Sequence, residues 1–440
     1  MNGTKDRVEA LVLRGATLPD GSRGVVRIVG DRVAEAGPAI RAKPTDMAVD
    51  LVGYVLLPAL VEPHAHLDKA FTAEQAPNPD GDLPGAIAAW VDARPGFTTD
   101  DIIGRARQAA LAYLVHGCTL IRTHVDVSAE IGLRGLHALM AVRDELAGAV
   151  DIELIAMCNN PVSGRAGKGN LAILRDALAA GADGVGGAPW LDADPPGATE
   201  ILADVAGEYD RVLDLHVDET TDASVSSLAL LGELAGRGFP KSITASHIVS
   251  LAGQPVGRQR RLAATLAAAR IGVVTLPQTN LWLQGRGGGP VPSRGLTAVR
   301  VLLDAGVLVA AGGDNLRDPF NPFGRADPFA TASLLAVAAH LSPAEALAAV
   351  TVDAWHVLGR RAPQITSGQP AHFVAVAGTS AADAMAGAPE TRIVFRGSRI
   401  VARSTTQREL SIPSKLSAAD LQYHDRRVSR AVGATTGVQW

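Results

Sequence analysis

Two histidines separated by one residue, His64 and His66, follow an apolar run in the segment PALVEPHAHLD at residues 58–68. Side chains alternate between the two faces of a strand, so both imidazoles project to one side, as two ligands of one metal ion must. Further candidate ligands come much later, each again at the end of an apolar run. They are His216 and Glu219 in VLDLHVDE, His247 in ITASHI, and Asp314 in VLVAAGGD. The pattern predicts one metal site assembled from distant segments.

The segments that carry these residues alternate with helical stretches. Short apolar, β-branched runs recur around residues 55–61, 118–125, 151–158, 183–190, 211–217, 241–247, 271–278 and 306–312. Stretches with helical spacing lie between them, such as residues 100–116 and 259–270. Eight strands that alternate with helices predict a (β/α)8 barrel. Active sites of this fold lie at the C-terminal ends of the strands, where all the candidate residues fall.

Composition narrows the class of protein. The 440 residues, 47% of them hydrophobic, are enough for one barrel of about 250–300 residues and a smaller module. A net charge of -4 without a Lys/Arg run argues against nucleic acid or an anionic membrane as partner. The sequence shows no signal peptide and no apolar stretch of about 20 residues, so we expect a cytoplasmic protein. Cys118 and Cys158 are expected to be buried thiols.

Both ends of the chain read as short strands. Residues 7–55 contain short segments of alternating apolar and polar residues separated by Gly and Asp turns, and residues 371–403 show the same pattern. We therefore expect a small β-sandwich built from both termini beside the barrel. The expected boundaries are 1–57 and 363–410 for the two parts of this domain, 58–362 for the barrel, and 411–440 for a polar tail with a short helix at 417–424.

Six motifs together resemble those of a known family. They are PALVEPHAHLDKAFT, IRTHVDVS, HVDETTD, TASH, NLWLQGR and GGDNLRDPFNPFG, in this order. The chain resembles the amidohydrolase superfamily, and specifically its cytosine deaminase-like branch, over most of residues 1–410. The resemblance implies one divalent metal ion, zinc or iron(II), bound by four residues: His64, His66, His216 and Asp314. Binuclear members use a carboxylated lysine at the end of strand 4, and residues 182–191 contain no lysine, so one ion is expected.

The resemblance also implies that Glu219 and His247 handle protons. A divalent ion with an open coordination position lowers the pKa of bound water to roughly 7. Attack on a ring carbon that bears an amino group also requires a protonated ring nitrogen, because ammonia is otherwise a poor leaving group. Glu219, three residues beyond His216, is placed to carry that proton. His247 is expected to polarise the attacking hydroxide, and Asp314 to bind the metal and accept a proton.

The expected substrate pocket departs from the cytosine deaminase pattern at three positions. That pattern has a second Asp after the metal-binding one, a Gln near the end of strand 3 and a Trp after the later Asp-Pro. This chain has Asn315, Asn159 and Phe320 in those places. An amide donates as well as accepts, and a buried hydrogen-bonding mismatch costs about 1–3 kcal/mol. Cytosine itself is therefore expected to be a poor substrate.

Further residues are candidates for the pocket. His124, which ends strand 2 together with Asp126, is expected to contact substrate or support the ligands rather than bind the metal. Arg317, like Arg286 and Lys69, is a candidate to bind a carboxylate or oxo group of the substrate. Ion pairs outside the pocket are the alternative for these cations.

The favoured function is hydrolytic deamination of a small, cytosine-like nitrogen heterocycle by a homo-oligomer. Two alternatives stay open. One is a related hydrolase of the same superfamily that releases an alkylamine or opens a cyclic amide, and the product distinguishes these reactions. The other is a catalytically silent barrel with a binding role, which typically lacks metal ligands, whereas no expected ligand is missing here.

Overall fold

The computed structural model describes residues 10–38, 40–286 and 294–407. The chain divides into two compact units. One unit comprises Val61–Tyr113 and Leu120–Arg361, and the other comprises Met1–Leu60, Leu114–Thr119 and Ala362–Trp440. The tail expected at residues 411–440, with its helix at 417–424, lies outside the described residues.

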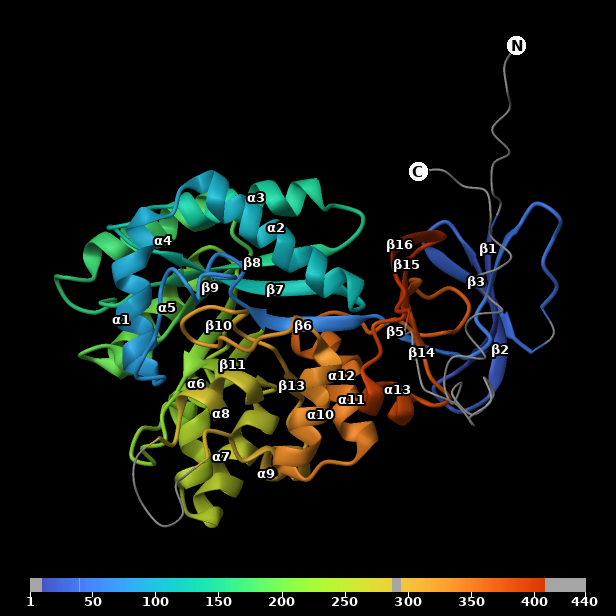
Figure 1. Cartoon of the computed structure of the whole chain (residues 1–440). Coiled ribbons are helices and arrows are strands. Elements are labelled where there is room, and N and C mark those ends of the chain that lie inside the picture. Colours follow the sequence, from blue (N-terminus) through green and yellow to red (C-terminus); the bar gives the residue numbers. More distant parts are fainter. Residues whose placement is uncertain (1–9, 39, 287–293, 408–440) are drawn as a thin grey trace, which may run out of the picture. The chain divides into compact units, whose positions relative to one another are not determined.

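The larger unit is built on eight strands that are hydrogen-bonded in the order of the sequence (Figure 1). They are β6 (Leu60–Ala65), β7 (Cys118–Val127), β8 (Asp151–Cys158), β9 (Gly184–Gly187), β10 (Val212–Val217), β11 (Ile243–His247), β12 (Gly272–Thr275) and β13 (Val309–Ala311). A parallel bridge between Ala65 and Asp314 brings the first and last segments of this sheet together. The predicted (β/α)8 barrel is confirmed.

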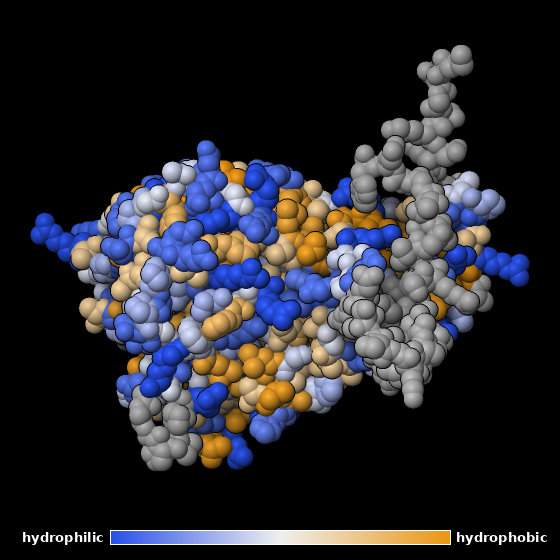
Figure 2. All heavy atoms as spheres, in the orientation of Figure 1, coloured by the Kyte–Doolittle hydropathy of each residue, from blue (hydrophilic) through white to orange (hydrophobic). Residues whose placement is uncertain are grey.

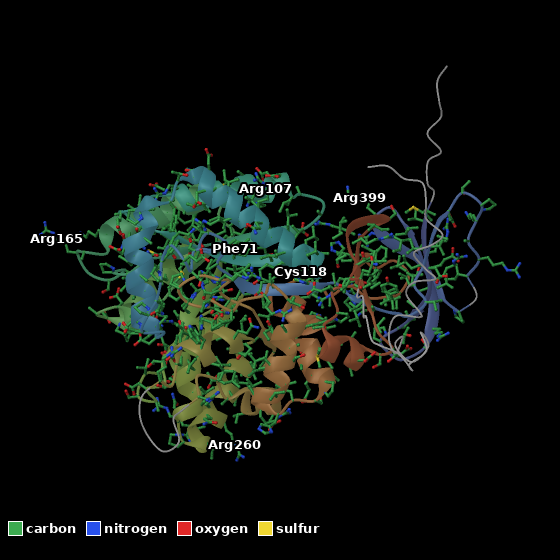
Figure 3. All side chains as sticks on the ribbon, in the orientation of Figure 1. Phe71, Arg107, Cys118, Arg165, Arg260 and Arg399 are labelled. Carbon is green, nitrogen blue, oxygen red and sulfur yellow. The ribbon has the colours of Figure 1, made fainter. Side chains whose placement is uncertain are left out.

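Helices follow the barrel strands and pack around them. They are α1 (Leu83–Ala93), α2 (Thr99–Val115), α3 (Arg134–Glu145), α4 (Lys168–Ala180), α5 (Pro195–Glu208), α6 (Leu228–Gly236), α7 (Val256–Ala268), α8 (Pro277–Leu283), α9 (Val299–Asp304), α10 (Pro328–Ala339), α11 (Pro343–Val350) and α12 (Val352–Val357). The helices predicted at 100–116 and 259–270 are present as α2 and α7. In α7, Leu262 and Leu266 are buried, whereas Arg260 points outward (Figure 3). This amphipathic pattern is what allowed the helix to be predicted.

The first barrel strand begins later than predicted. The apolar run at residues 55–61 is divided between two sheets, since β5 (Tyr54–Pro58) pairs antiparallel with β14 (His372–Ala377). The barrel strand β6 starts at Leu60 and continues through His64. Both strands are buried on both faces, so no alternation of polar residues marks the point where the pairing partner changes.

Other predicted strands are also shorter than expected, and proline explains two of them. The runs at 183–190 and 271–278 yield only β9 and β12. Pro189 and Pro277 follow these strands and begin helical turns. Proline has no N–H to donate to a sheet and is favoured at the first position of a helix, which explains the difference.

The second unit is one mixed sheet that unites both ends of the chain. Its strands are β1 (Leu11–Thr17), β2 (Arg23–Val29), β3 (Arg32–Gly37), β4 (Met47–Asp50), β5, β14, β15 (Arg392–Arg396) and β16 (Arg399–Ser404), and α13 (Ala381–Gly387) lies between β14 and β15. The order is β16-β15-β14-β5-β1-β2-β3, with β4 paired to β1. Leu13, Ile28, Leu56, Phe373 and Phe395 share one buried core. The β domain expected from both termini is confirmed.

The face drawn in Figure 2 mixes hydrophilic and hydrophobic residues over the barrel helices. Single apolar side chains such as Val337 and Phe323 are exposed, which is ordinary for a folded surface. Within residues 10–38, 40–286 and 294–407, none of the helices has both the length and the apolar character needed to span a bilayer.

Candidate active site

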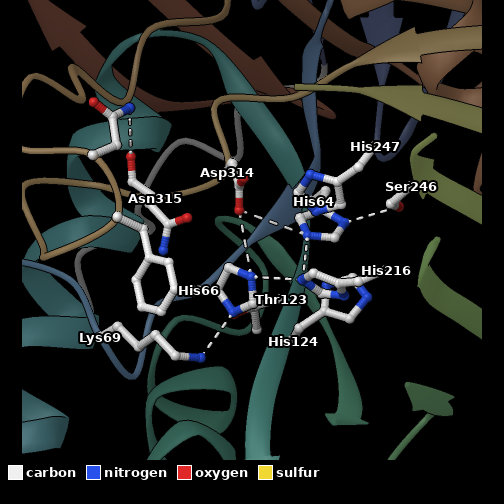
Figure 4. A network of polar contacts seen from close by, with 12 residues as sticks. His64, His66, Lys69, Thr123, His124, His216, Ser246, His247, Asp314 and Asn315 are labelled. Atoms are coloured by element: carbon white, nitrogen blue, oxygen red, sulfur yellow. Dashed lines mark hydrogen bonds and ion pairs between the residues drawn. The ribbon is translucent and has the colours of Figure 1, made fainter. Parts of the chain in front are cut away.

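Four side chains converge where three barrel strands end (Figure 4). His64 and His66 come from β6 and the residue after it, His216 from β10, and Asp314 from the segment after β13. Nε2 of His216 lies 3.2 Å from Nε2 of His64 and 3.1 Å from Nε2 of His66. Oδ1 of Asp314 lies 3.4 Å from Nε2 of His66 and 3.7 Å from Nε2 of His64. Four potential ligand atoms therefore face one another.

The separation of these atoms suits one metal ion. Two ligands about 2.0–2.1 Å from a tetrahedral zinc ion lie about 3.3 Å from each other, close to the distances between the Nε2 atoms. Burial lowers the pKa of each of the three imidazoles well below its usual value, so each is neutral and keeps a lone pair for a metal. The Asp314 carboxylate is buried and its oxygens have no hydrogen-bond partner among the described residues. A cation between these groups would balance the negative charge of that carboxylate, so the donor set fits a divalent ion.

The backbone around Asp314 is shaped for this position. Asp314 has a φ of 62°, a left-handed conformation that costs a non-glycine residue about 1–3 kcal/mol. The preceding glycines let the chain approach β6 closely. A Cβ atom on Gly312 would lie 2.7 Å from Oε1 of Glu62, and Gly313 donates its N–H to Oε2 of Glu62 at 2.9 Å. The GGD sequence thus brings the carboxylate against the strand that carries the first two histidines.

A carboxyl and an imidazole form a second polar pair beside the four convergent side chains. Oε1 of Glu219 accepts a hydrogen bond from Nδ2 of Asn280 at 2.9 Å and lies 3.3 Å from Nδ1 of His247. Gln284 donates from Nε2 to the backbone oxygen of Glu219 at 3.0 Å. Burial raises the pKa of Glu219 to about 8 and lowers the pKa of His247 to about 3. At neutral pH this places a protonated carboxyl beside a neutral imidazole, an arrangement suited to proton donation.

The site opens into a pocket of about 380 Å³. Its lining includes His66, His216, Glu219, His247 and Asp314. The apolar side chains of Leu83, Ile87 and Phe320 also line it and pack together. This volume and mixture of apolar walls with a few polar groups are typical of small-molecule sites.

A buried charged group forms another part of the lining. Lys69 donates from Nζ to Oδ1 of Asp126 at 2.8 Å and lies 3.1 Å from Nδ1 of His66. The indole of Trp90 donates to the other oxygen of Asp126 at 2.7 Å. Burial opposes ionisation of Asp126, but the Lys69 ammonium holds the pKa of the carboxyl below its usual value. The ion pair is therefore a fixed polar feature of the pocket.

The structure brings three of the five expected substrate contacts to the pocket: Asn159, Asn315 and Phe320. The side-chain amide of Asn159 lies between the Met157 carbonyl oxygen and the Arg94 guanidinium. The side-chain amide of Asn315 donates a hydrogen bond to the carboxylate of Asp318.

The other two expected contacts are not among the described residues that line this pocket. His124 is fully buried, with Nε2 3.3 Å from Oδ1 of Asp214. Arg317 is exposed and donates from Nε to the Gly324 carbonyl oxygen at 3.3 Å. Arg286 is exposed as well and lies against the Trp282 ring. A loop residue that lies close in sequence to the C-terminal end of a barrel strand therefore need not point into the pocket.

Several residues of the site were not assigned a role from the sequence. Ser246 contacts His64, Asn280 contacts both Glu219 and His247, and Trp90 contacts Asp126. Asn280 belongs to the motif NLWLQGR, which offered a signal for its importance. Trp90 lies on α1 in an ordinary amphipathic pattern, which carries no signal for a pocket role.

A family model, sequence relatives and solved structures all indicate the same family for this chain. Residues 93–402 match the amidohydrolase family. The chain is 29% identical over 407 residues to the pterin deaminase of Rhizobium rhizogenes, which covers 90% of this chain and 92% of that protein. It superimposes on the 5-methylcytosine deaminase from Klebsiella pneumoniae with a TM-score of 0.83 and 25% identity, covering 91% and 99% of the two chains. The N-isopropylammelide isopropylaminohydrolase from Burkholderia multivorans gives a TM-score of 0.79 and 31% identity, with 90% and 99% covered.

A parallel barrel with histidines and a carboxylate gathered at its C-terminal mouth defines the architecture of a metal-dependent hydrolase. Because the family match spans well over half of the sequence, the chain belongs to the amidohydrolase family. It is an enzyme that hydrolyses carbon–nitrogen bonds, and the resemblance seen in the six motifs is confirmed.

Proposed function

We propose that this protein is a mononuclear metal-dependent deaminase of a small amino-substituted nitrogen heterocycle. The observation that carries the proposal is the convergence of three neutral imidazoles and one buried carboxylate next to the pair Glu219 and His247. All of these residues except the fully buried His64 line one pocket. His64, His66, His216 and Asp314 would hold one ion, zinc or iron(II). A cytoplasmic location, a homo-oligomeric state and the expected domain boundaries stay predictions from the sequence.

Each residue of the site has a separate role in the proposed reaction. A divalent ion held there lowers the pKa of water to roughly 7 and supplies a nucleophile at neutral pH. Glu219 gives its proton to a ring nitrogen while the water oxygen bonds to the ring carbon that bears the amino group. Asp314 accepts the proton released by the water. His247 holds its imidazole beside the reacting atoms through Asn280. Asp314 then gives its proton to the amino group, the carbon–nitrogen bond breaks with release of ammonia, and the remaining hydroxyl proton returns to Glu219 as the ring carbonyl forms.

The pocket residues orient the ring. Phe320, Leu83 and Ile87 offer apolar surface for the faces of a planar heterocycle. Asn159 and Asn315 offer amides to its polar edge. The relatives named for pterin and 5-methylcytosine deamination support a planar amino-substituted ring as substrate.

Release of an alkylamine is the second candidate reaction. The isopropylaminohydrolase relative, at 31% identity over 90% of this chain, supports it. The apolar residues that line the pocket suit a short alkyl group as well as they suit a ring face. Both candidates share the same ligands and the same proton donor, and they differ in the group that leaves the ring carbon.

A substrate screen combined with metal analysis tests the proposal. The purified protein is expected to contain about one divalent ion per chain and to release ammonia from at least one amino-substituted pyrimidine, pterin or triazine. Glu219→Gln should keep its metal while kcat falls by at least about 100-fold. Isopropylamine in place of ammonia would select the second candidate. A chain that binds no metal, or a fully active Glu219→Gln protein, would refute the mechanism.

A further inference from the structure

Behind the ligand His64 lies a polar residue that the mechanism above does not use. Ser246, fully buried on β11, places its Oγ 2.9 Å from Nδ1 of His64. The same hydroxyl donates to Oδ1 of Asp214 at 3.2 Å. Asp214 is itself fully buried and accepts from Arg122 at 2.9 Å through its other oxygen. These contacts connect residues on four different barrel strands.

Strand periodicity explains why these groups meet. Asp214 precedes His216 by two residues on β10, and Arg122 precedes His124 by two on β7, so each pair projects to the same face. Ser246 is paired with His216 across the β10–β11 register. A layer of buried charge therefore lies next to the layer of histidines, inside the barrel.

Counting protons determines the state of His64. A serine hydroxyl has one hydrogen to donate. The Asp214 carboxylate pairs with the guanidinium of Arg122 and has no hydrogen to offer, so Ser246 donates to Asp214 and must accept from His64. Nδ1 of His64 then carries the imidazole hydrogen, and Nε2 keeps its lone pair. That lone pair faces His216 and Asp314, where the metal would lie.

Among the described residues, the other two imidazoles have no side-chain acceptor at Nδ1. Nδ1 of His216 has no hydrogen-bond partner among the described residues. Nδ1 of His66 faces the Lys69 ammonium, which donates and does not accept. Among the side-chain contacts that the described residues make with Nδ1 of these three imidazoles, the one with Ser246 can thus accept a ring hydrogen, whereas the ring of His66 has a backbone hydrogen bond to His124.

We propose that Ser246 and Asp214 are positioning residues that fix the tautomer and ring orientation of His64 for metal binding, with Arg122 holding Asp214 in place. The inference rests on the proposed metal site and extends it to groups that touch neither metal nor substrate. Partners of this kind typically change metal affinity 10–100-fold when they are removed.

Metal affinity of the stripped and reloaded full-length protein tests the inference directly. Zn²⁺ affinity, measured by competition with a chromophoric chelator, should fall about 10–100-fold in Ser246→Ala. Ser246→Thr, which keeps the hydroxyl, should recover most of that loss. The absorption spectrum of the Co²⁺-loaded protein should change in Ser246→Ala and resemble the wild-type spectrum in Ser246→Thr.

A double-mutant cycle and a matched control separate positioning from simple packing. Asp214→Asn combined with Ser246→Ala should bind Zn²⁺ no more weakly than the poorer single variant, because the two residues act through one contact. Arg360→Ala removes the ion pair to Glu153, which Arg122 also contacts, without touching Asp214. Its Zn²⁺ affinity should equal that of the wild type.

Two results distinguish the failure of this inference from the failure of the proposed function. If Ser246→Ala lowers only the melting temperature of the metal-free protein and binds Zn²⁺ as the wild type does, the positioning role is overturned while the metal site stands. If the wild-type protein binds no Zn²⁺ or Co²⁺, the metal site itself is refuted and this inference with it.

Discussion

Asn315 donates from its side-chain amide to the carboxylate of Asp318 across 2.7 Å, and both residues are buried. Asp318 also accepts from the backbone N–H groups of Phe320 and Asn321 through its other oxygen. The amide that replaces a carboxylate of the cytosine deaminase pattern is therefore part of a closed turn next to the proposed metal site. Burial raises the pKa of Asp318 to about 6, so a second carboxylate at this point would face an ionised one at pH 8.

Asn315→Asp should therefore destabilise the protein in a pH-dependent manner. We expect a loss of about 1–3 kcal/mol in the free energy of unfolding at pH 8, because a hydrogen bond is replaced by two adjacent carboxylates. Their folded-state pKa values rise above the unfolded value of about 3.9. A carboxyl group whose pKa is raised in the folded state stabilises that state at low pH. This contribution is lost as the pH rises through the pKa of the folded state. Urea unfolding of the metal-free protein at pH 5 and pH 8 measures the difference.

The control for this variant is Asn315→Ala, which removes the hydrogen bond without adding a charge. It should show a smaller change between the two pH values. Equal losses for the aspartate variant at both pH values would contradict the explanation. The same proteins also answer whether the aspartate restores cytosine turnover, for which we expect weak activity in the natural enzyme.

The fourth ligand of the proposed metal site can be identified by a pair of substitutions. His124 is close enough to His64 and His216 to form an alternative three-residue group, yet its Nε2 faces Asp214 at 3.3 Å. We therefore expect Asp314→Asn to lose at least about 100-fold in metal affinity and His124→Asn to retain its metal. Metal content after dialysis measures both variants. The opposite pattern would make His124 the ligand in place of Asp314.

The indole of Trp90 should contribute measurably to stability through Asp126. Trp90→Phe keeps an aromatic ring but removes the donor of a 2.7 Å hydrogen bond to a charged group. Such bonds contribute about 1.5–3 kcal/mol, and we expect a loss of that size in urea unfolding. Trp190→Phe is the matched control, because the Trp190 indole N–H has no hydrogen-bond partner among the described residues. Equal losses in both variants would indicate that packing, not the hydrogen bond, is responsible.

Cys158 should be unreactive although it lines the pocket. Burial raises the pKa of its thiol to about 12, and only the thiolate reacts with alkylating reagents. At pH 8 the native protein should react with iodoacetamide at least about 100-fold more slowly at this residue than the urea-unfolded chain does. Mass spectrometry of a Cys158 peptide follows the modification. Rapid labelling of Cys158 in the native protein would contradict the raised pKa.

Local periodicity made much of this protein predictable from its sequence. The spacing of His64 and His66 requires that both face one side of a strand, and the barrel topology brings strand ends such as those at His216 and Asp314 to one mouth. These features depend on chain geometry that repeats every two residues or every turn of a helix. The eight barrel strands and the β domain from both termini followed from the same patterns.

Only the tertiary structure decided the features that depend on contacts between distant residues. It divided the apolar run at Ala59 between two sheets, since backbone partners and not hydrophobicity determine where a strand belongs. In the tertiary structure Arg317 is exposed, and the side chain of Asn315 is hydrogen-bonded to Asp318. It also placed Ser246 behind His64, 182 residues away in the chain. Side-chain direction in loops and polar partners across a barrel arise from packing, which leaves no periodic trace in the sequence.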